Sequence, residues 1–338
     1  MADIAILGSG GFGLALAIMC RRAGHNVVVW SKFRDEIDTI MRTGSLKAKL
    51  PGVKIPKDVV LTTDISCVKG KKLVIVGIPT SFIRSVCEEA APFVSEDSII
   101  VNTAKGLENG TLKTMSVVMR EVFPKNTIAV LTGPSHAEEL ARGIPTTVVV
   151  ASDNTEASNY VQDILSNSTF RVYVNDDVIG CEIGGSLKNV IALAAGVIDG
   201  LGMGDNTKAA LMTRGIKEIR TLGLAMGARS ETFSGLSGIG DLIVTCCSMH
   251  SRNRRAGILI GKGVDPAEAV EQVGTVEGYV CTENAYALSK KLGVELPITE
   301  QLYKLLFEGV QPAEALKTLM GRPTKNETET DFLIRNSF

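Results

Sequence analysis

The stretch Ile4-Ala5-Ile6-Leu7-Gly8-Ser9-Gly10-Gly11-Phe12-Gly13 decides the fold of this 338-residue chain. Four apolar residues precede a Gly-x-Gly-x-x-Gly pattern, and Leu14-Ala15-Leu16-Ala17-Ile18 continues it as a helix. This context, strand before and helix after, predicts a dinucleotide-binding loop. Gly8 permits the turn, Gly10 lets the backbone approach a pyrophosphate, and Gly13 lets the helix pack on the strand. The anion is expected on the free amides of the helix N-terminus.

The rest of the first half repeats this alternation of strand and helix. Short apolar runs bounded by Gly, Pro or Lys predict strands buried on both faces. They lie at 4–7, 26–30, 73–76, 98–102, 127–131 and 146–151. Helices are predicted at 12–23, 81–94 and 111–122. The alternation predicts an α/β fold with a Rossmann-like, doubly wound and mostly parallel sheet.

From about residue 177 the strand pattern stops and the sequence becomes helical. Helices are predicted at 179–200, 206–226, 252–261, 266–273, 282–292, 299–308 and 312–320. We therefore predict a dinucleotide-binding domain at 1–178 and an all-helical substrate-binding domain at 179–338. No linker rich in Pro or Ser separates the two, so the site is expected in the crevice between them.

The composition narrows the class of protein. Hydrophobic residues make up 45% and charged residues 22%, as in ordinary globular proteins. A net charge of −1 and an aromatic content of 5% argue against a nucleic-acid partner. Seven cysteines without paired spacing predict a reducing compartment and no metal. Because the first predicted strand begins at residue 4, we expect no signal peptide, and the longest apolar stretch, 190–198, is too short to span a membrane. We expect a cytoplasmic protein without membrane insertion.

The end of the second predicted strand bears on the choice of cofactor. NAD-specific folds usually place an acid there to bond the ribose 2′-hydroxyl. This chain has Trp30-Ser31-Lys32-Phe33-Arg34, and its first acid, Asp35, is expected to begin the next helix. Lys32 and Arg34 could meet a 2′-phosphate, so NADPH is the favoured cofactor on this reasoning. The alternative is that both are solvated loop charges.

Two lysines lie in unusual surroundings. Lys105 follows the strand at 98–102, at the carboxyl edge of the sheet where ligands bind in open α/β folds. Three of the four helical neighbours of Lys188 are Gly or Ala, so another backbone can approach it closely. Burial there would lower the pKa of its ammonium group. The alternatives are a solvated Lys105 and a Lys188 whose stem extends from a core helix to solvent.

The stretch Ser251-Arg252-Asn253-Arg254-Arg255 predicts an anion site in the helical half. Ser251 is a good N-cap, and the free amides of the first helical turn attract an anion. Arg252 and Asn253 add donors suited to phosphate. Three arginines oppose the helix dipole, which a bound anion would explain; the alternative is a solvated basic turn. Upstream, Asp241 lies in a glycine-rich segment, where it could orient a lysine or cap a helix.

Taken together, these residues resemble the bacterial type of NAD(P)-dependent glycerol-3-phosphate dehydrogenase over essentially the whole chain. Beyond the glycine loop, the segments that carry the resemblance are Ile78-Pro79-Thr80, Thr103-Ala104-Lys105-Gly106, Leu131-Thr132-Gly133-Pro134-Ser135-His136-Ala137-Glu138-Glu139, Asn175-Asp176-Asp177-Val178-Ile179-Gly180, Gly184-Gly185-Ser186-Leu187-Lys188-Asn189 and Ser251-Arg252-Asn253-Arg254-Arg255. One departure is Thr275, which precedes Val276-Glu277-Gly278 where the family pattern has valine.

The resemblance implies reduction of dihydroxyacetone phosphate to sn-glycerol 3-phosphate, a precursor of phospholipids, by a homodimer that uses NAD(P)H. It implies that Lys188 is the catalytic proton donor and acceptor, assisted by Lys105 and Asp241. The residues implied in substrate binding are Lys105, Gly133, Ser135, Lys188, Asp241, Ser251, Arg252 and Asn253. Those implied in cofactor binding are Gly8, Gly10, Gly11, Phe12, Gly13, Lys32, Lys105, Ala137, Arg252, Val276 and Glu277.

Two other functions remain open at this point. A β-hydroxyacid dehydrogenase also joins such a cofactor domain to a helical half and uses a lysine, but its substrate carries no phosphate. The anion site at Ser251–Arg255 argues against it. A non-catalytic NAD(P)-binding sensor could keep the fold, but the presence of Lys188 and of the Arg252-Asn253 pair argues against that.

Overall fold

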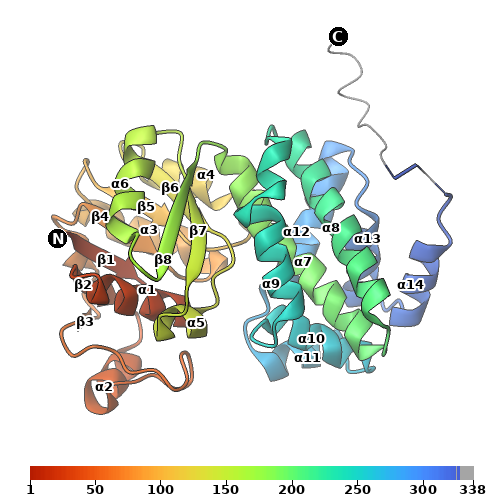
Figure 1. The fold of residues 1–338 in the computed structure, drawn as a ribbon, viewed down its shortest axis with the longest axis horizontal. Helices are drawn as coiled ribbons and strands as arrows, with labels where there is room; N and C mark the ends of the chain where they lie inside the picture. Colours follow the sequence, from red (N-terminus) through yellow and green to blue (C-terminus); the bar gives the residue numbers. More distant parts are fainter. Residues whose placement is uncertain (325, 328–338) are drawn as a thin grey trace, which may run out of the picture.

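The computed structural model describes residues 1–324, 326 and 327, so the end of the predicted second domain lies outside the described residues. Figure 1 shows a sheet with its covering helices on one side of the molecule and a group of helices on the other. The sheet half comes from the first part of the chain and the helical half from the second, as predicted.

The sheet has eight strands in the order β3-β2-β1-β4-β5-β6-β7-β8. The strands are β1 Asp3–Leu7, β2 Asn26–Trp30, β3 Val60–Thr62, β4 Leu73–Val76, β5 Ile99–Asn102, β6 Thr127–Thr132, β7 Thr146–Ala151 and β8 Phe170–Asn175. All neighbours pair in parallel except β6 and β7, which are antiparallel. The doubly wound, mostly parallel sheet is therefore confirmed.

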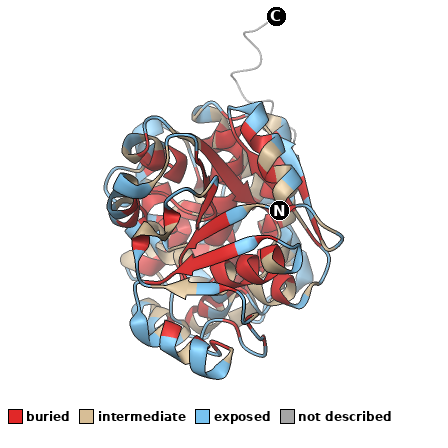
Figure 2. Cartoon of the chain, turned by 90° about the vertical axis from the view of Figure 1, so that its left-hand side faces the viewer, coloured by how far each residue is buried: buried red, intermediate tan, exposed pale blue. Residues whose placement is uncertain are grey.

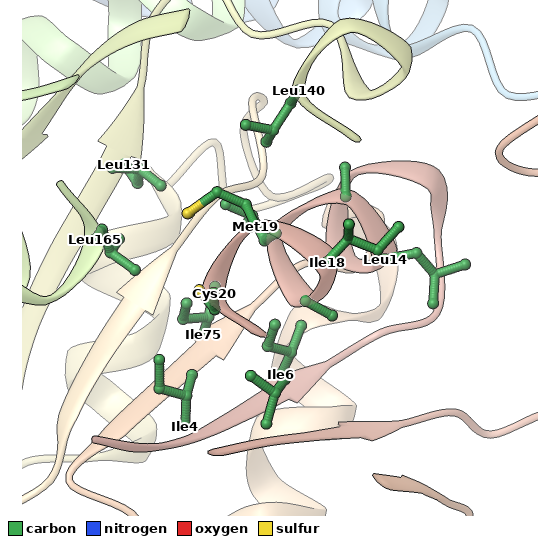
Figure 3. Packing of buried hydrophobic residues seen from close by; sticks show 14 of the residues in the cluster. Ile4, Ile6, Leu14, Ile18, Met19, Cys20, Ile75, Leu131, Leu140 and Leu165 are labelled. Carbon is green, nitrogen blue, oxygen red and sulfur yellow. The ribbon is translucent and has the colours of Figure 1, made fainter. Parts of the chain in front are cut away.

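Helices cover both faces of this sheet. In β1, Ile4 and Ile6 join one core, while Ala5 and Leu7 join the core on the opposite face. Figure 3 shows the first of these cores, where Leu14 and Ile18 of the first helix pack over the strands. The helices and short helical turns of this half are α1 Gly11–Arg22, α2 Arg34–Thr43, η1 Ile65–Val68, η2 Thr80–Phe82, α3 Ile83–Ala90, η3 Ala91–Phe93, α4 Met115–Val122, α5 Ala137–Arg142 and α6 Thr155–Leu165. Figure 2 shows the result, with buried strands inside and exposed helix surfaces outside.

Several elements of this half were not predicted from the sequence, and both edge strands are among them. Strands β3 and β8 end the sheet on either side, and β8 alternates buried and exposed residues instead of forming one apolar run. An edge strand therefore lacks the pattern of a strand buried on both faces. The helix predicted at 111–122 begins only at Met115, because Leu112 has a left-handed backbone with φ of 60°. Helices α5 and α6 were also not predicted.

The second half is built around α7 (Val178–Gly200). Around it lie α8 Asp205–Ala225, η4 Ser230–Ser234, the π-helical turn η5 Leu236–Gly240, α9 Asp241–Cys247, α10 Arg252–Gly261, α11 Pro266–Val273, α12 Glu277–Leu292, α13 Pro297–Phe307 and α14 Pro312–Met320. By length and composition α7 could cross a membrane, although the sequence showed only a shorter apolar stretch. However, 94% of its most apolar window is buried inside the protein, so its apolar residues form the core of this half.

Close packing of glycines holds α10 against α7. A Cβ on Gly196 would lie 2.1 Å from the Arg254 carbonyl oxygen, and one on Gly257 would lie 2.1 Å from that of Leu193. Gly200 and Gly261 repeat the contact one turn further on. The helices approach this closely because no side chains stand between their backbones. The contact fixes the start of α10, with its arginines, relative to the middle of α7.

Candidate active site

The glycine loop lies where the strand order of the sheet reverses. It follows β1, which pairs with β2 on one side and with β4 on the other. Gly8 has φ of 122°, and a Cβ there would lie 2.5 Å from the Gly77 carbonyl oxygen. A Cβ on Gly13 would lie 2.2 Å from the Gly8 carbonyl oxygen, so only glycine lets helix and strand pack. The predicted roles of Gly8 and Gly13 are confirmed as backbone requirements.

The same loop can bind a pyrophosphate, because no side chain caps the backbone amides at the start of α1. Gly10 is the N-cap of α1 and has no side-chain cap. A Cβ on Gly10 would meet only the Gly77 carbonyl oxygen, at 3.8 Å, so the space beside Gly10 is open. Gly11 faces the Lys49 carbonyl oxygen and Ala137, the first residue of α5, while Phe12 is partly exposed. Ala137 therefore lies beside the loop.

Near the end of β2 the structure places an acidic side chain, Glu36, that the sequence prediction did not consider. Lys32 is exposed, and exposed Arg34 pairs with Asp38 at 3.1 Å. Glu36, which the sequence did not single out, returns to the glycine loop, where its Oε2 accepts a hydrogen bond from Ser9 Oγ at 2.5 Å. The preference for NADPH, inferred from Lys32 and Arg34, stays a prediction.

Three segments bring two lysines to one buried carboxylate. Lys105 follows β5, Lys188 lies in the middle of α7, and Asp241 is the first residue of α9. Lys105 Nζ donates to Asp241 Oδ2 at 2.6 Å and to the Gly133 carbonyl oxygen at 3.0 Å. Lys188 Nζ donates to Asp241 Oδ1 and, at 2.9 Å, to Thr245 Oγ1. We call Lys105, Lys188 and Asp241 the lysine cluster.

Burial sets the charges of the lysine cluster. The side chains of Asp241 and Lys188 are 1% and 8% exposed. Burial, with the nearby charge of Lys105, lowers the pKa of the Lys188 ammonium group to about 8, although Asp241 opposes the shift. Burial also acts to raise the pKa of Asp241, but the two lysines outweigh it and hold that pKa below its usual value. The lowered pKa of Lys188 thus agrees with the prediction from sequence. Of the two roles expected for Asp241, orienting a lysine or capping a helix, the structure shows the first.

Two glycines before Lys188 make room for the site. A Cβ on Gly184 would lie 2.4 Å from the Ser237 carbonyl oxygen, and one on Gly185 would lie 2.7 Å from Thr132 Oγ1. The small neighbours of Lys188 therefore admit other parts of the chain, as the sequence predicts. The Thr132 hydroxyl is buried and finds no hydrogen-bond partner among the described residues. It is a polar group beside Lys105 that a ligand could satisfy.

The end of β6 adds backbone groups to the site. Gly133 has φ of 127°, which disfavours any residue with a side chain, and its carbonyl oxygen accepts from Lys105. Ser135 Oγ donates to the same carbonyl oxygen at 2.9 Å. Both residues predicted to bind substrate from this segment therefore lie beside the lysine cluster.

The predicted anion site at the start of α10 is partly changed by the structure. Ser251 caps the helix by accepting from the Arg254 amide at 3.2 Å. Arg254 Nε donates to Asp199 Oδ2 at 2.7 Å, so its charge is matched within the protein. The argument that three arginines lack a counter-anion is therefore wrong for Arg254. Arg252 and Arg255 are exposed.

Asn253, Asn189 and Glu277 connect this helix to the lysine cluster. Asn253 Nδ2 donates to Asn189 Oδ1 at 2.9 Å. Asn189 Nδ2 lies 3.2 Å from Glu277 Oε2 and 3.3 Å from the Lys105 carbonyl oxygen. Burial raises the pKa of Glu277, against the opposing charges of Arg252, Lys188 and Lys105. Val276 precedes Glu277 as the N-cap of α12, which begins before the predicted residue 282.

Two residues that contact the site were not assigned from the sequence. Asn189 was part of a quoted segment but had no role of its own. Thr245 bonds Lys188 and also donates to the Asp241 carbonyl oxygen at 2.6 Å. Its spacing of four residues from Asp241 places both on one face of a helix, a signal that the sequence did contain. Among the described residues, no group of three or more His, Cys, Asp or Glu is placed to hold a metal ion.

Comparison with known proteins agrees with this arrangement. Residues 3–158 match the family described as NAD-dependent glycerol-3-phosphate dehydrogenase N-terminus, and residues 177–317 match its C-terminus. A glycerol-3-phosphate dehydrogenase [NAD(P)+] of Fusobacterium nucleatum is 50% identical over 98% of this chain and all of the relative, and one of Moorella thermoacetica is 50% identical over 97% and 98%. The crystal structure of a glycerol-3-phosphate dehydrogenase from Coxiella burnetii is 36% identical, with a TM-score of 0.91 over 95% of this chain and 99% of that one. The chain belongs to the NAD-dependent glycerol-3-phosphate dehydrogenase family and is an oxidoreductase.

Proposed function

We propose that this enzyme reduces dihydroxyacetone phosphate to sn-glycerol 3-phosphate, reversibly, with NADH or NADPH, and so supplies glycerophospholipid synthesis. The observation that carries the proposal is the lysine cluster, in which one buried and one partly buried ammonium group share one buried carboxylate at the carboxyl edge of the sheet. The relatives named above carry the corresponding activity in their names.

Lys188 is the proton donor in this proposal. The nicotinamide, when bound, supplies a hydride to the carbonyl carbon of the substrate. As negative charge develops on the carbonyl oxygen, Lys188 Nζ donates a proton to it and becomes neutral. A pKa of about 8 favours this transfer, because the group is mostly protonated at neutral pH and still gives up its proton readily. In the reverse direction neutral Lys188 accepts the proton.

Lys105 and Asp241 support that step. Asp241 holds Lys188 and Lys105 in place through its two oxygens. Because two ammonium groups share one carboxylate, the cluster keeps an excess positive charge, which stabilises the developing oxyanion. Gly133 and Ser135 border the same space from the end of β6.

The phosphate of the substrate is assigned to the start of α10. The amides of its first turn favour an anion, and exposed Arg252 adds a charged donor. Asn253 and Ser251 complete this set, although Ser251 also caps the helix. Arg254 is left out, because it is paired with Asp199.

The cofactor is assigned to the glycine loop and its neighbours. The uncapped N-terminus of α1 receives the pyrophosphate on the amides after Gly10. Phe12, Lys32 and Ala137 are proposed as cofactor contacts from the loop side. Lys105, Arg252, Val276 and Glu277 are proposed as contacts from the other side.

We further propose two domains, 1–178 and 179–338, in a cytoplasmic homodimer without a nucleic-acid partner. The domain boundary is supported by the end of β8 at Asn175 and the start of α7 at Val178. The seven cysteines are all unpaired, as expected in a reducing compartment. The dimer is supported only by the family resemblance.

One assay tests the proposed reaction. The purified protein is mixed with NADH or NADPH and dihydroxyacetone phosphate, and oxidation of the nucleotide is followed by absorbance. We expect oxidation with this substrate and little with unphosphorylated dihydroxyacetone. Oxidation with 3-oxo acids but not with the phosphorylated ketone would instead support a β-hydroxyacid dehydrogenase. Binding of nucleotide without any turnover would support the sensor.

A further inference from the structure

Glu36 stands where the second strand of the sheet meets the glycine loop. It lies in the first turn of α2 and its Oε2 accepts from Ser9 Oγ at 2.5 Å. Ser31 directly follows β2, and its Oγ lies 2.7 Å from Ser9 Oγ and 3.4 Å from the same Glu36 oxygen. Ser9 is the residue between the first two glycines of the loop. The carboxylate therefore occupies the place from which a strand-end acid acts in this fold, although it comes from the next helix.

The second oxygen of Glu36 has capacity left for a ligand. Lys49 Nζ lies 3.9 Å from this oxygen, and the side chains of Glu36 and Lys49 are 20% and 49% exposed. That distance is beyond a hydrogen bond. An ionised carboxylate offers about four acceptor positions, and the two serines use only one oxygen. Glu36 can therefore accept from a hydroxyl group that enters beside the loop.

The positive charges near the end of β2 are placed less favourably for a phosphate. Arg34 is 70% exposed and pairs with Asp38 at 3.1 Å on the helix surface. Lys32 is exposed, and Lys49 already faces Glu36. A dianionic group beside Ser9 would thus lie next to the Glu36 carboxylate.

We infer that Glu36 is a specificity-determining residue. Its carboxylate accepts hydrogen bonds from the hydroxyls of the adenosine ribose and makes the enzyme favour NADH over NADPH. Strand-end acids in dinucleotide-binding folds bond the ribose 2′-hydroxyl. A 2′-phosphate would bring like charges together at a partly buried place, which disfavours binding. The inference rests on the proposed cofactor and reverses the preference that Lys32 and Arg34 predict from the sequence.

A merely structural role of Glu36 makes a different prediction. If it only holds Ser9 and Ser31 in place, its charge is irrelevant to the nucleotide. Glu36→Gln keeps an oxygen that can accept from Ser9 and removes the charge. Asp35→Asn removes the same charge from the neighbouring residue, which is exposed, and serves as the matched control.

Binding can be measured without turnover through Trp30. It is the only tryptophan of the chain, it ends β2, and it is 3% exposed. Its fluorescence is recorded while NADH or NADPH is added to the wild-type protein and to both variants. The fragments 5′-AMP and 2′,5′-ADP are titrated in the same way, because they differ only at the 2′ position.

The expected result has three parts. The wild-type protein binds NADH more tightly than NADPH, and 5′-AMP more tightly than 2′,5′-ADP. Glu36→Gln shifts the NADH-to-NADPH affinity ratio towards NADPH by about tenfold or more, as expected for removing a close like charge. Asp35→Asn leaves the ratio within about twofold, since an exposed charge at that distance is screened.

Other results overturn the inference. A ratio unchanged in Glu36→Gln, or a wild-type preference for NADPH, contradicts it while leaving the proposed function intact. A wild-type protein that binds neither nucleotide would overturn the proposed cofactor and the inference together. If Glu36→Gln does not fold, the fragment titration of the wild-type protein still decides, because equal or tighter binding of 2′,5′-ADP contradicts the inference.

Discussion

The glycine loop and the lysine cluster differ in the groups that they offer to a ligand and in how the chain brings these groups together. The loop is one contiguous segment, Gly8–Gly13, and offers backbone amides and space instead of side chains. The lysine cluster gathers Lys105, Lys188 and Asp241 from three separate segments, and Lys105 and Asp241 are 136 positions apart in the sequence. The loop is therefore set by local backbone geometry, whereas the cluster exists only once both halves have folded.

The two regions also differ in the free-energy cost of forming them. Leaving amides free at the open end of α1 costs little, because solvent can reach them. Placing three charges in the cluster, two of them buried, costs much more, and their mutual attraction offsets the cost only with good geometry. Asp241 meets that condition, since both its oxygens accept from lysines. We expect the chemistry to depend on the cluster and cofactor binding to depend on the loop, and the following variants separate the two.

The largest expected effect is from Lys188→Ala. Loss of the proton donor and of its charge should lower kcat by about 10²–10⁴-fold. The affinity for the nucleotide, measured through Trp30 fluorescence, should stay within about twofold of wild type, because Lys188 belongs to the cluster and not to the loop. Lys262→Ala, at an exposed lysine just after α10, is the control. Near-normal kcat in Lys188→Ala would remove its assigned role.

A smaller effect is expected from Arg252→Ala. Loss of a charge-assisted contact to the substrate phosphate should raise KM for dihydroxyacetone phosphate by about 10–100-fold. Turnover of unphosphorylated dihydroxyacetone should change far less. Arg255→Ala removes an exposed arginine from the same helix and should leave both parameters close to wild type. Equal losses with both substrates would contradict the phosphate assignment.

The smallest effect is on stability and tests how α10 is held. A Cβ on Gly257 would press on the Leu193 carbonyl oxygen, so Gly257→Ala should lower the free energy of unfolding by about 1–3 kcal/mol. Gly204→Ala is the control, because a Cβ there meets nothing within 4 Å. Urea denaturation of both variants gives the comparison. Equal stability of the two would mean that the glycine contact between α7 and α10 is looser than described.

The contrast also explains what the sequence could reveal. The glycine loop was predicted with its backbone roles, because strand, turn and helix are adjacent in the chain. The burial of Lys188 was predicted from its small helical neighbours, which is again a local signal. The partners of the lysine, by contrast, depend on how α9 packs on α7, and periodicity says nothing about that.

The incorrect or missing predictions concern features that depend on how segments pack together and not on the local sequence. Arg254 was counted as part of an anion site, but packing against α7 turns it to Asp199. Glu36 was overlooked because a helix, not the strand end, brings its carboxylate back to the loop. Strands β3 and β8 were missed because edge strands do not form continuous apolar runs.

The most direct test of the central claim is the pH dependence of kcat/KM for reduction of dihydroxyacetone phosphate. Reduction needs protonated Lys188, whose pKa is about 8, so kcat/KM should be level below that pH and fall about tenfold per pH unit above it. In Asp241→Asn the fall should begin at lower pH. The Asp241 carboxylate raises the pKa of Lys188, so its removal lowers that pKa. A fall at the same pH in both proteins, or none at all, would contradict the assignment of Lys188 as a proton donor held by Asp241.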